Sequence, residues 1–550
     1  MDYRFREGRV AQERVRSQAQ LSLALQPIRT RDHRRRGGTL LDRGTDQGRG
    51  GAYRQGEGGY EVPHYPRRRH ALGNCGQVWH QRVQDLLPQQ RSQAYHYPQH
   101  RSEDQGKMMN KKVYIETYGC QMNVADTEVI FSLLEKHGYE RTEDMSQADV
   151  IMANTCSVRD NAEQRILGRI EQFHFQKKQR PGVLVGILGC MAERLKGALI
   201  DTGKVDIVAG PDAYRSLPVL LQNAAPGMPQ INVELSREET YADISPVRLD
   251  KNGVSAFISI MRGCNNVCSY CVVPYTRGAE RSRDSHSIVR EACDCARKGY
   301  KEVTLLGQNV DSYHFEDCNF AALLKLVAES CPQMRVRFST SNPQDISDEV
   351  LQVMASHANI CHHIHLPVQS GSDRMLEKMR RRYTREGYLE RVAAIRRYMP
   401  DCAISTDVIA GFCSETEEDH RLTLSLFEEV GFDAAYMFYY SERPGTLAAR
   451  KYPDDVPQEV KNRRLEEIIA LQNRLSLESN ERDIGKTFRV LVEGPSKRNP
   501  AQLCGRAGNN KMCVWPDTEH KAGDFVDVEV LSCTQATLIC RAAGGTGTGA

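Results

Sequence analysis

The 550-residue sequence contains no run of about 18 apolar residues, the length that a membrane-spanning helix requires. It also lacks the basic and then apolar opening that marks a secretory signal. Without an export signal, its 18 cysteines point away from a disulfide framework and toward metal or redox chemistry in a reducing compartment. We therefore expect no membrane association and a cytoplasmic location.

Residues 1–107 contain a single isoleucine, Ile28, and show no sustained hydrophobic period. They hold 19 Arg and 1 Lys against 11 acidic residues, a net charge of +9, whereas residues 108–550 carry −6. Such a composition cannot bury enough apolar surface to offset chain entropy. We interpret residues 1–108 as a disordered or mis-assigned N-terminal extension, with translation starting at Met108 or Met109. A basic RNA-binding arm and an organelle transit peptide are the alternatives.

Residues 110–226 repeat a unit in which a β-rich run ends on a cysteine and a helical pattern follows. The runs are 112–120, 149–156 and 182–190, and a fourth strand is expected at 204–210. This alternation predicts a doubly wound parallel sheet, whose strand C-termini share one edge. Cys120, Cys156 and Cys190 should converge there. Three thiolates suit a four-iron cluster with one open iron, and three buried structural cysteines are the alternative.

Cys264, Cys268 and Cys271 form a Cys-x3-Cys-x2-Cys loop after a strand-like run from Phe257. Thiolates this close can wrap a four-iron cluster but ligate only three of its irons. The fourth iron is then free to chelate the amino and carboxylate groups of S-adenosylmethionine. A zinc knuckle is the alternative, but no fourth Cys or His stands at short spacing. The pattern resembles that of the radical S-adenosylmethionine superfamily.

Further strand candidates are 302–306, 335–339, 363–366, 403–409 and 434–440, with helical patterns between them. Together with the first strand they make six β/α units, a partial (β/α)6 barrel within residues 250–482. In barrels the chemistry belongs at the strand C-termini, and polar, glycine-rich residues stand there. The residues that we predict to contact S-adenosylmethionine are Gln308, Asn309, Gln369, Ser370, Gly411 and Glu415. For each of them an ordinary βα turn is the alternative.

A long amphipathic helical pattern at 458–482 leads into alternating strands within residues 483–546, which predict a small β barrel. The cations that we predict to bind RNA are Lys497, Arg498, Arg506 and Lys511. They give a positive face to an otherwise acidic part of the chain, which favours RNA binding over simple solvation. The fold class is therefore α/β, with a doubly wound sheet, a partial barrel and a small β barrel in that order.

Several motifs within residues 110–546 resemble the methylthiotransferase family of radical S-adenosylmethionine enzymes. They lie at 118–123, 154–156, 189–190, 262–278, 365–371 and 379–383. The first motif, Tyr-Gly-Cys-Gln-Met-Asn, resembles the tRNA-modifying branch more than the ribosomal-protein branch, which has Leu-Gly-Cys-Pro-Lys-Asn. Ala279 departs from the pattern, because tRNA-modifying members often carry a charged residue there. The C-terminal module resembles the RNA-contacting TRAM domain.

The resemblance implies two [4Fe-4S] clusters, one on Cys120, Cys156 and Cys190 and one on Cys264, Cys268 and Cys271, and two S-adenosylmethionine molecules per turnover. The implied reaction inserts a methylthio group at C2 of the isopentenylated adenosine beside the anticodon of tRNA. Threonylcarbamoyl-adenosine in tRNA and an aspartate of a ribosomal protein are alternative substrates. An iron–sulfur RNA-binding protein without turnover is the non-enzymatic alternative. A flavodoxin- or ferredoxin-like electron donor is implied, and we expect a monomer.

Overall fold

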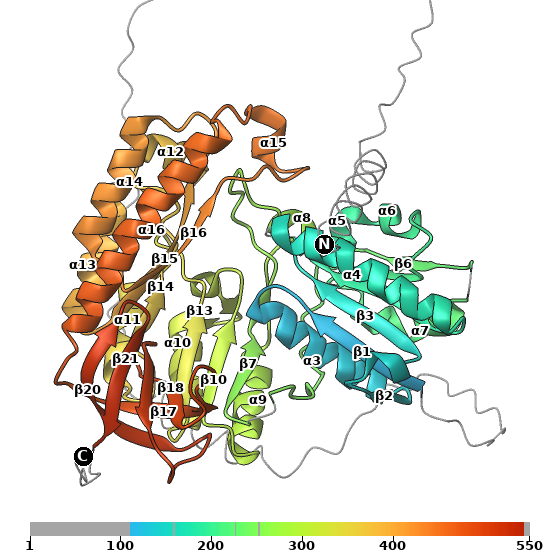
Figure 1. Cartoon of the computed structure of the whole chain (residues 1–550), viewed down its shortest axis with the longest axis horizontal. Coiled ribbons are helices and arrows are strands. Elements are labelled where there is room, and N and C mark those ends of the chain that lie inside the picture. Colours follow the sequence, from blue (N-terminus) through green and yellow to red (C-terminus); the bar gives the residue numbers. More distant parts are fainter. Residues whose placement is uncertain (1–110, 158–159, 226, 251–252, 544–550) are drawn as a thin grey trace, which may run out of the picture. The chain divides into compact units, whose positions relative to one another are not determined.

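The computed structural model describes residues 111–157, 160–225, 227–250 and 253–543 (Figure 1). The described residues belong to one compact unit. The extension interpreted above, residues 1–108, lies outside the described residues. Within the described part of the chain, no helix combines the length and the apolar character that crossing a membrane requires.

The N-terminal region is a six-stranded sheet in which all neighbouring strands are parallel. From edge to edge the strands are β2 (Tyr139–Arg141), β1 (Lys111–Thr117), β3 (Val150–Thr155), β4 (Leu184–Gly189), β5 (Ile207–Ala209) and β6 (Gln230–Asn232). The helices between them are α3 (Gln121–Glu135), η1 (Met145–Gln147), α4 (Asp160–Gln179), α5 (Cys190–Leu195), α6 (Gly197–Ile200), η2 (Tyr214–Ser216) and α7 (Leu217–Asn223). The predicted doubly wound parallel sheet is confirmed.

The N-terminal sheet differs from its sequence prediction in local detail. The edge strands β2 and β6 are not predicted, because three residues are too few to show a hydrophobic period. Helix α3 begins directly after Cys120. The helical segment after Cys190 is divided at Lys196, whose φ of 47° separates α5 from α6.

The central region is the predicted partial barrel of six parallel strands. They are β7 (Ser255–Ser259), β10 (Glu302–Leu306), β13 (Arg335–Ser339), β14 (His363–His365), β15 (Ala403–Ala410) and β16 (Ala434–Tyr439). The first three form one sheet and the last three another, and a parallel bridge between Val336 and Ile360 joins the two halves. Two short pairs, β8 (Met261–Arg262) with β9 (Arg281–Ser282) and β11 (His314–Phe315) with β12 (Cys318–Asn319), lie outside this series.

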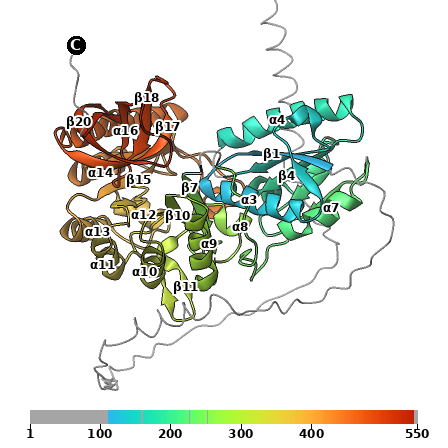
Figure 2. The same cartoon turned by 90° about the horizontal axis from the view of Figure 1, so that it is seen from below.

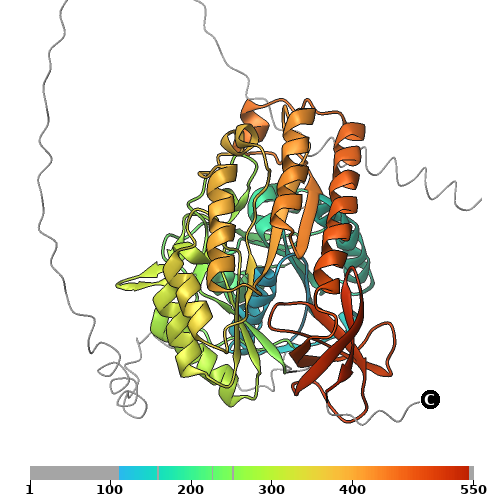
Figure 3. The same ribbon diagram turned by 90° about the vertical axis from the view of Figure 1, so that its left-hand side faces the viewer.

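Helices stand between and after the barrel strands along the chain. They are α8 (Val273–Thr276), α9 (Ser285–Arg297), η3 (Val310–Ser312), α10 (Phe320–Ser330), α11 (Asp348–Ser356), α12 (Asp373–Lys378), α13 (Arg385–Tyr398), α14 (Glu417–Val430), α15 (Leu447–Lys451) and α16 (Gln458–Glu481). Figure 3 shows the yellow and orange helices side by side, with the red C-terminal strands beside the last of them.

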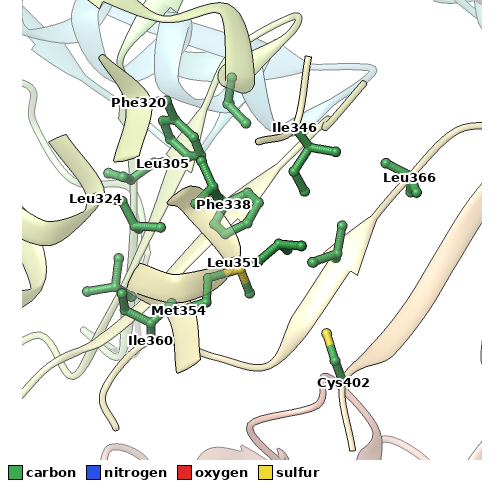
Figure 4. Packing of buried hydrophobic residues seen from close by; sticks show 14 of the residues in the cluster. Leu305, Phe320, Leu324, Phe338, Ile346, Leu351, Met354, Ile360, Leu366 and Cys402 are labelled. Carbon is green, nitrogen blue, oxygen red and sulfur yellow. The ribbon is translucent and has the colours of Figure 1, made fainter. Parts of the chain in front are cut away.

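The barrel core lies between the strands and these helices. Alternate strand residues point outward into it, such as Leu305 and Phe338, and they pack against Phe320 and Leu324 of α10 (Figure 4). The intervening strand residues point into the barrel and include buried charges. There the Arg337 Nε donates to Glu302 Oε2 at 2.7 Å. The packed core therefore holds the strand ends, and the loops that follow them, in fixed positions.

The C-terminal region is a closed barrel of five strands, so the predicted small β barrel is confirmed. Its strands, in order around the barrel, are β17 (Thr487–Pro495), β18 (Gln502–Arg506), β19 (Met512–Pro516), β21 (Thr537–Ala542) and β20 (Phe525–Thr534). Trp515 is fully buried in its core. Arg335 and Arg337, on β13, donate to the backbone carbonyls of Arg506 and Ala507 at 2.6 and 2.8 Å. These bonds attach the small barrel to the central barrel.

Candidate metal centres

Cys120, Cys156 and Cys190, the sheet triad, follow three neighbouring strands of the N-terminal sheet. Cys120 follows β1 and caps α3, Cys156 follows β3, and Cys190 follows β4 and is the first residue of α5. The strand ends are level, because Thr117 pairs with Asn154 and Thr155 pairs with Gly189. The predicted convergence of these cysteines at one sheet edge is therefore observed.

The thiols of the sheet triad interact with one another. A hydrogen bond with Cys156 lowers the pKa of Cys120 to about 6, whereas burial raises the pKa of Cys190.

The turn before Cys190 leaves room only for glycine. Gly189 has a φ of +85°, and a Cβ there would lie 2.5 Å from Asn154 Oδ1. This glycine therefore fixes where Cys190 enters its helix.

Cys264, Cys268 and Cys271, the loop triad, lie on one loop between β8 and α8. Each sulfur accepts an N–H group at 3.4 Å: Cys264 from the Asn266 amide, Cys271 from the Val273 amide, and Cys268 from Arg381 Nη1. Such bonds stabilise negative charge on sulfur and tune iron–sulfur clusters. Gly263, which starts the loop, has a φ of +74°, and a Cβ there would lie 2.1 Å from the Ala279 carbonyl oxygen.

The donor sets fit four-iron clusters. Each triad offers three thiols, and within the described ranges no three or more His, Cys, Asp or Glu side chains are placed to hold a single metal ion. A four-iron cluster instead spreads its ligands over several irons. Burial raises the pKa of Cys264 to about 11 and that of Cys271 to about 12. Iron would therefore have to displace protons from these thiols as it binds.

One turn of helix links the two triads. Val273, whose amide faces Cys271, begins α8, and α8 packs against α5, which begins at Cys190. Arg277 follows α8 and is 3% exposed. Its Nη2 donates to Asn123 Oδ1 and to Asp126 Oδ2, both at 2.9 Å. A residue of the loop-triad segment thus reaches the first turn of the helix that Cys120 caps.

Buried ion pairs and apolar contacts join the N-terminal sheet to the barrel. Arg262 Nη1 lies 2.6 Å from Asp126 Oδ1, and Arg281 Nη2 lies 2.9 Å from Asp212 Oδ1. Helix α3 packs on β7, as Figure 2 shows, with Met122 in one apolar cluster with Leu306. Sequence reasoning gives none of these arginines a role. Arg262 and Arg277 do stand in the motif at 262–278, which is the only signal for them.

The predicted S-adenosylmethionine contacts divide into two groups. Gln308 Oε1 and Asn309 Oδ1, at the end of β10, are buried and have no hydrogen-bond partner among the described residues, so they are available to a ligand. Gln369, in the loop after β14, has a φ of 68°, and its backbone N–H donates to the Asp407 carbonyl. In the second group, the polar side-chain atoms make hydrogen bonds within the protein. Ser370 Oγ lies 3.3 Å from Thr423 Oγ1.

The two remaining predicted contacts, Gly411 and Glu415, bind each other in the loop after β15. Glu415 holds this loop in place. Its Oε2 accepts the Gly411 amide at 2.7 Å and pairs with Arg464 Nη1 at 2.9 Å. Because of these contacts, Ser370 and Glu415 shape the loops at the C-terminal ends of the barrel strands.

The histidines of β14 share one partner, since His363 Nε2 and His365 Nδ1 each lie 3.0 Å from Ser405 Oγ.

The cations predicted for RNA binding are not equivalent. Lys497 and Arg498 are exposed in the loop between β17 and β18. Arg506 Nε lies 3.1 Å from Glu493 Oε1 and keeps 41% of its side chain exposed. Lys511 does not belong to this exposed face. It is 12% exposed, because its ammonium pairs with Asp483 at 2.6 Å at the end of α16.

Comparisons with known proteins follow the same division of the chain. Three family models match: the uncharacterized protein family UPF0004 over residues 112–210, the Radical SAM superfamily over 258–427, and the TRAM domain over 481–542. The fold and the two triads therefore define a radical S-adenosylmethionine protein with a C-terminal TRAM domain.

Curated relatives narrow the assignment. The tRNA-2-methylthio-N(6)-dimethylallyladenosine synthase of Phocaeicola vulgatus is 60% identical over 434 residues, which cover 78% of this chain and 95% of the relative. That of Bacteroides thetaiotaomicron is 59% identical with the same coverage. The chain belongs to the family of tRNA-2-methylthio-N(6)-dimethylallyladenosine synthases. Among solved structures, the radical S-adenosylmethionine methyltransferase TsrM of Kitasatospora setae matches 62% of this chain and 77% of its own, with 14% identity and a TM-score of 0.48. At that level the likeness carries no functional information.

Proposed function

We propose that this protein adds a methylthio group to C2 of N6-dimethylallyladenosine in tRNA, at the adenosine beside the anticodon. The observation that carries the proposal is family membership, at 60% identity over 95% of a relative that is named for this reaction. The two complete cysteine triads support it, because a sulfur-inserting radical reaction needs separate places for the radical and for the sulfur.

The target bond explains the need for a radical. The C2–H bond of adenine is unactivated, so no side chain of ordinary pKa could deprotonate it usefully. When bound, a cluster on the loop triad would supply the electron that cleaves S-adenosylmethionine, and one on the sheet triad would carry the sulfur to be methylated and delivered.

The residues of this chain hold and insulate those groups. Arg381 Nη1, 3.4 Å from Cys268 Sγ, would stabilise a charged thiolate in the loop triad. Gln308 and Asn309 offer unpaired oxygens at the end of β10, where S-adenosylmethionine would bind. The apolar packing of Met122 against Leu306 excludes water from the contact between sheet and barrel.

The finer parts of the proposal follow from the same chemistry. They are two [4Fe-4S] clusters, two S-adenosylmethionine molecules per turnover, an electron donor of the flavodoxin or ferredoxin type, and a monomer that meets tRNA in the cytoplasm. Lys497, Arg498 and Arg506 would contact RNA phosphates. The domains would span residues 110–226, 250–482 and 483–546.

Anaerobic reconstitution with iron and sulfide tests the proposal directly. The protein is supplied with S-adenosylmethionine, a reductant and tRNA that either carries or lacks the N6-dimethylallyl group, and nucleosides and 5′-deoxyadenosine are measured by mass spectrometry. The methylthiolated nucleoside should form only with dimethylallylated tRNA. Formation of product only on threonylcarbamoyl-adenosine, or only on ribosomal protein, would assign a different substrate. Iron incorporation without 5′-deoxyadenosine would refute the enzymatic function.

A further inference from the structure

We propose that Arg277 is a positioning residue for the cluster of the sheet triad. Its guanidinium, carried by the loop-triad segment, offsets the negative charge of that cluster and ties the two triads together. The inference rests on the proposed function for the presence of a four-iron cluster at the sheet triad. It adds a role for a residue that contributes no ligand.

The contacts of Arg277 place it beside the thiols. Its Nη2 donates to Asn123 Oδ1 at 2.9 Å, and the same oxygen lies 3.7 Å from Cys120 Sγ. Its other terminal nitrogen, Nη1, is buried without a hydrogen-bond partner among the described residues. A buried cationic donor without a partner is costly. A sulfur atom of a cluster bound at the sheet triad would accept a hydrogen bond from this nitrogen.

The net charge of the buried ion pairs around Arg277 also supports the proposal. Arg262, Arg277 and Arg281 face Asp126 and Asp212, which leaves one positive charge within this network. All five side chains are at most 4% exposed. An oxidised four-iron core with three thiolates carries one negative charge. Bound at the sheet triad, it would offset this positive charge.

Arg262 provides a matched control. It pairs with the same Asp126 carboxylate as Arg277 and is equally buried, at 2% against 3%. Its other contacts are to the Pro211 carbonyl at 3.0 Å, to Asp212 and to the ring of Tyr241, rather than to Asn123. Loss of either arginine removes one buried cation from Asp126. Only the loss of Arg277 removes the cation that lies against the cysteines.

The test uses the full chain with Cys268→Ala, which keeps only the cluster of the sheet triad, so that its signal is read alone. In this background we expect Arg277→Gln to shift the midpoint potential of the cluster to a more negative value. The reason is that a nearby cation favours the reduced, more negative cluster. Arg277→Lys keeps the positive charge, so its potential should lie close to that of the parent. Arg262→Gln should also leave the potential close to that of the parent.

An unchanged potential in Arg277→Gln, or an equal shift in Arg262→Gln, would overturn the proposal. If Arg277→Gln fails to retain iron, iron content decides: retention by Arg277→Lys supports a role for charge, and loss in both variants overturns it. These measurements need no tRNA. A protein that holds the cluster but does not methylthiolate tRNA would refute the proposed function and leave the role of Arg277 measurable.

Discussion

The sheet triad is assembled from three strand ends separated by 35 and 33 residues, whereas the loop triad lies within eight residues of one loop. The first therefore exists only after the parallel sheet has formed and brought β1, β3 and β4 into register. The second is close together in the chain itself and needs the fold mainly for donors such as Arg381. Two sites of the same ligand chemistry thus depend on the fold to different degrees.

The largest expected effects come from removing one cysteine of each triad. Cys268→Ala should abolish 5′-deoxyadenosine formation, and Cys156→Ala should preserve it while methylthiolation stops. In both variants, iron should fall from about eight to about four atoms per chain. Iron analysis and mass spectrometry of both products check this. Cys318→Ala, which removes a partly exposed thiol outside both triads, is the control. Methylthiolation that persists in either triad variant would contradict the division of roles.

Replacing the glycine next to one triad should disturb the backbone there and affect the iron content of that triad alone. Gly189→Ala and Gly263→Ala each impose a positive φ on alanine and a contact of 2.5 Å or less, so we expect each to destabilise its site by about 1–3 kcal/mol. Gly189→Ala should lose iron from the sheet triad and keep 5′-deoxyadenosine formation, and Gly263→Ala should do the reverse. Gly138→Ala, with a φ of +81° and no atom within 4 Å, controls for strain alone. Equal iron loss from both triads in one variant would show that the sites are not independent.

Two buried carboxyl groups should give opposite pH dependences in the iron-free protein. Burial raises the pKa of Asp311, near the end of β10, to about 7, whereas Arg262 and Arg277 hold the pKa of Asp126 below its usual value. A raised carboxyl pKa means that stability falls as pH rises from about 4 to about 7, and Asp311→Asn should remove this fall. A lowered pKa means that stability is present above about pH 4 and is lost as pH falls further.

Asp126→Asn should therefore lower stability near neutral pH and flatten the acid side. Urea unfolding across pH measures both effects, since the free energy of unfolding is obtained at each pH. The same slope in Asp311→Asn as in the parent protein would show that Asp311 is ionised throughout. The comparison contrasts a carboxyl group that two arginines hold beside the sheet triad with one that pairs with no cation among the described residues.

The smallest expected effect lies outside both triads. Lys497→Gln and Arg498→Gln should each weaken tRNA binding a few-fold and reduce the salt dependence of log Kd by about 1, because each removes one phosphate contact. Lys511→Gln makes the same charge change inside an ion pair, so it should lower the free energy of unfolding and leave the salt dependence unchanged. Filter binding at several salt concentrations distinguishes them. A change of salt dependence in Lys511→Gln alone would reverse the assignment.

Much of the fold is predictable from local pattern. Strands β10 and β13 have the predicted bounds, because each is a short run between a helical pattern and a polar turn. The cysteines of the loop triad lie within eight residues of the sequence. Those of the sheet triad each follow a strand in successive strand–helix units. Both kinds of repetition can be read from the sequence without knowing any contact.

What could not be predicted depends on contacts between distant residues. Arg262 and Asp126 are 136 residues apart, and no periodicity relates them. Lys511 reads as a surface cation until α16 places Asp483 beside it. Glu415 stands after a strand, as a cofactor contact would, but Arg464 of α16 takes its carboxylate. In each case a partner on another element decides what the side chain does.

Helix α16 also determines which part of an RNA could be reached. Near its start, Lys461 donates to the carbonyl of Tyr440, just beyond β16, and at its end Asn480 donates to Thr534 of the small barrel. Its 24 residues span about 36 Å. A nucleic acid held by the small barrel must therefore extend by a comparable length before one of its bases arrives at the barrel mouth. Selection among RNAs would then depend on the reach of a folded stem as well as on the identity of the base.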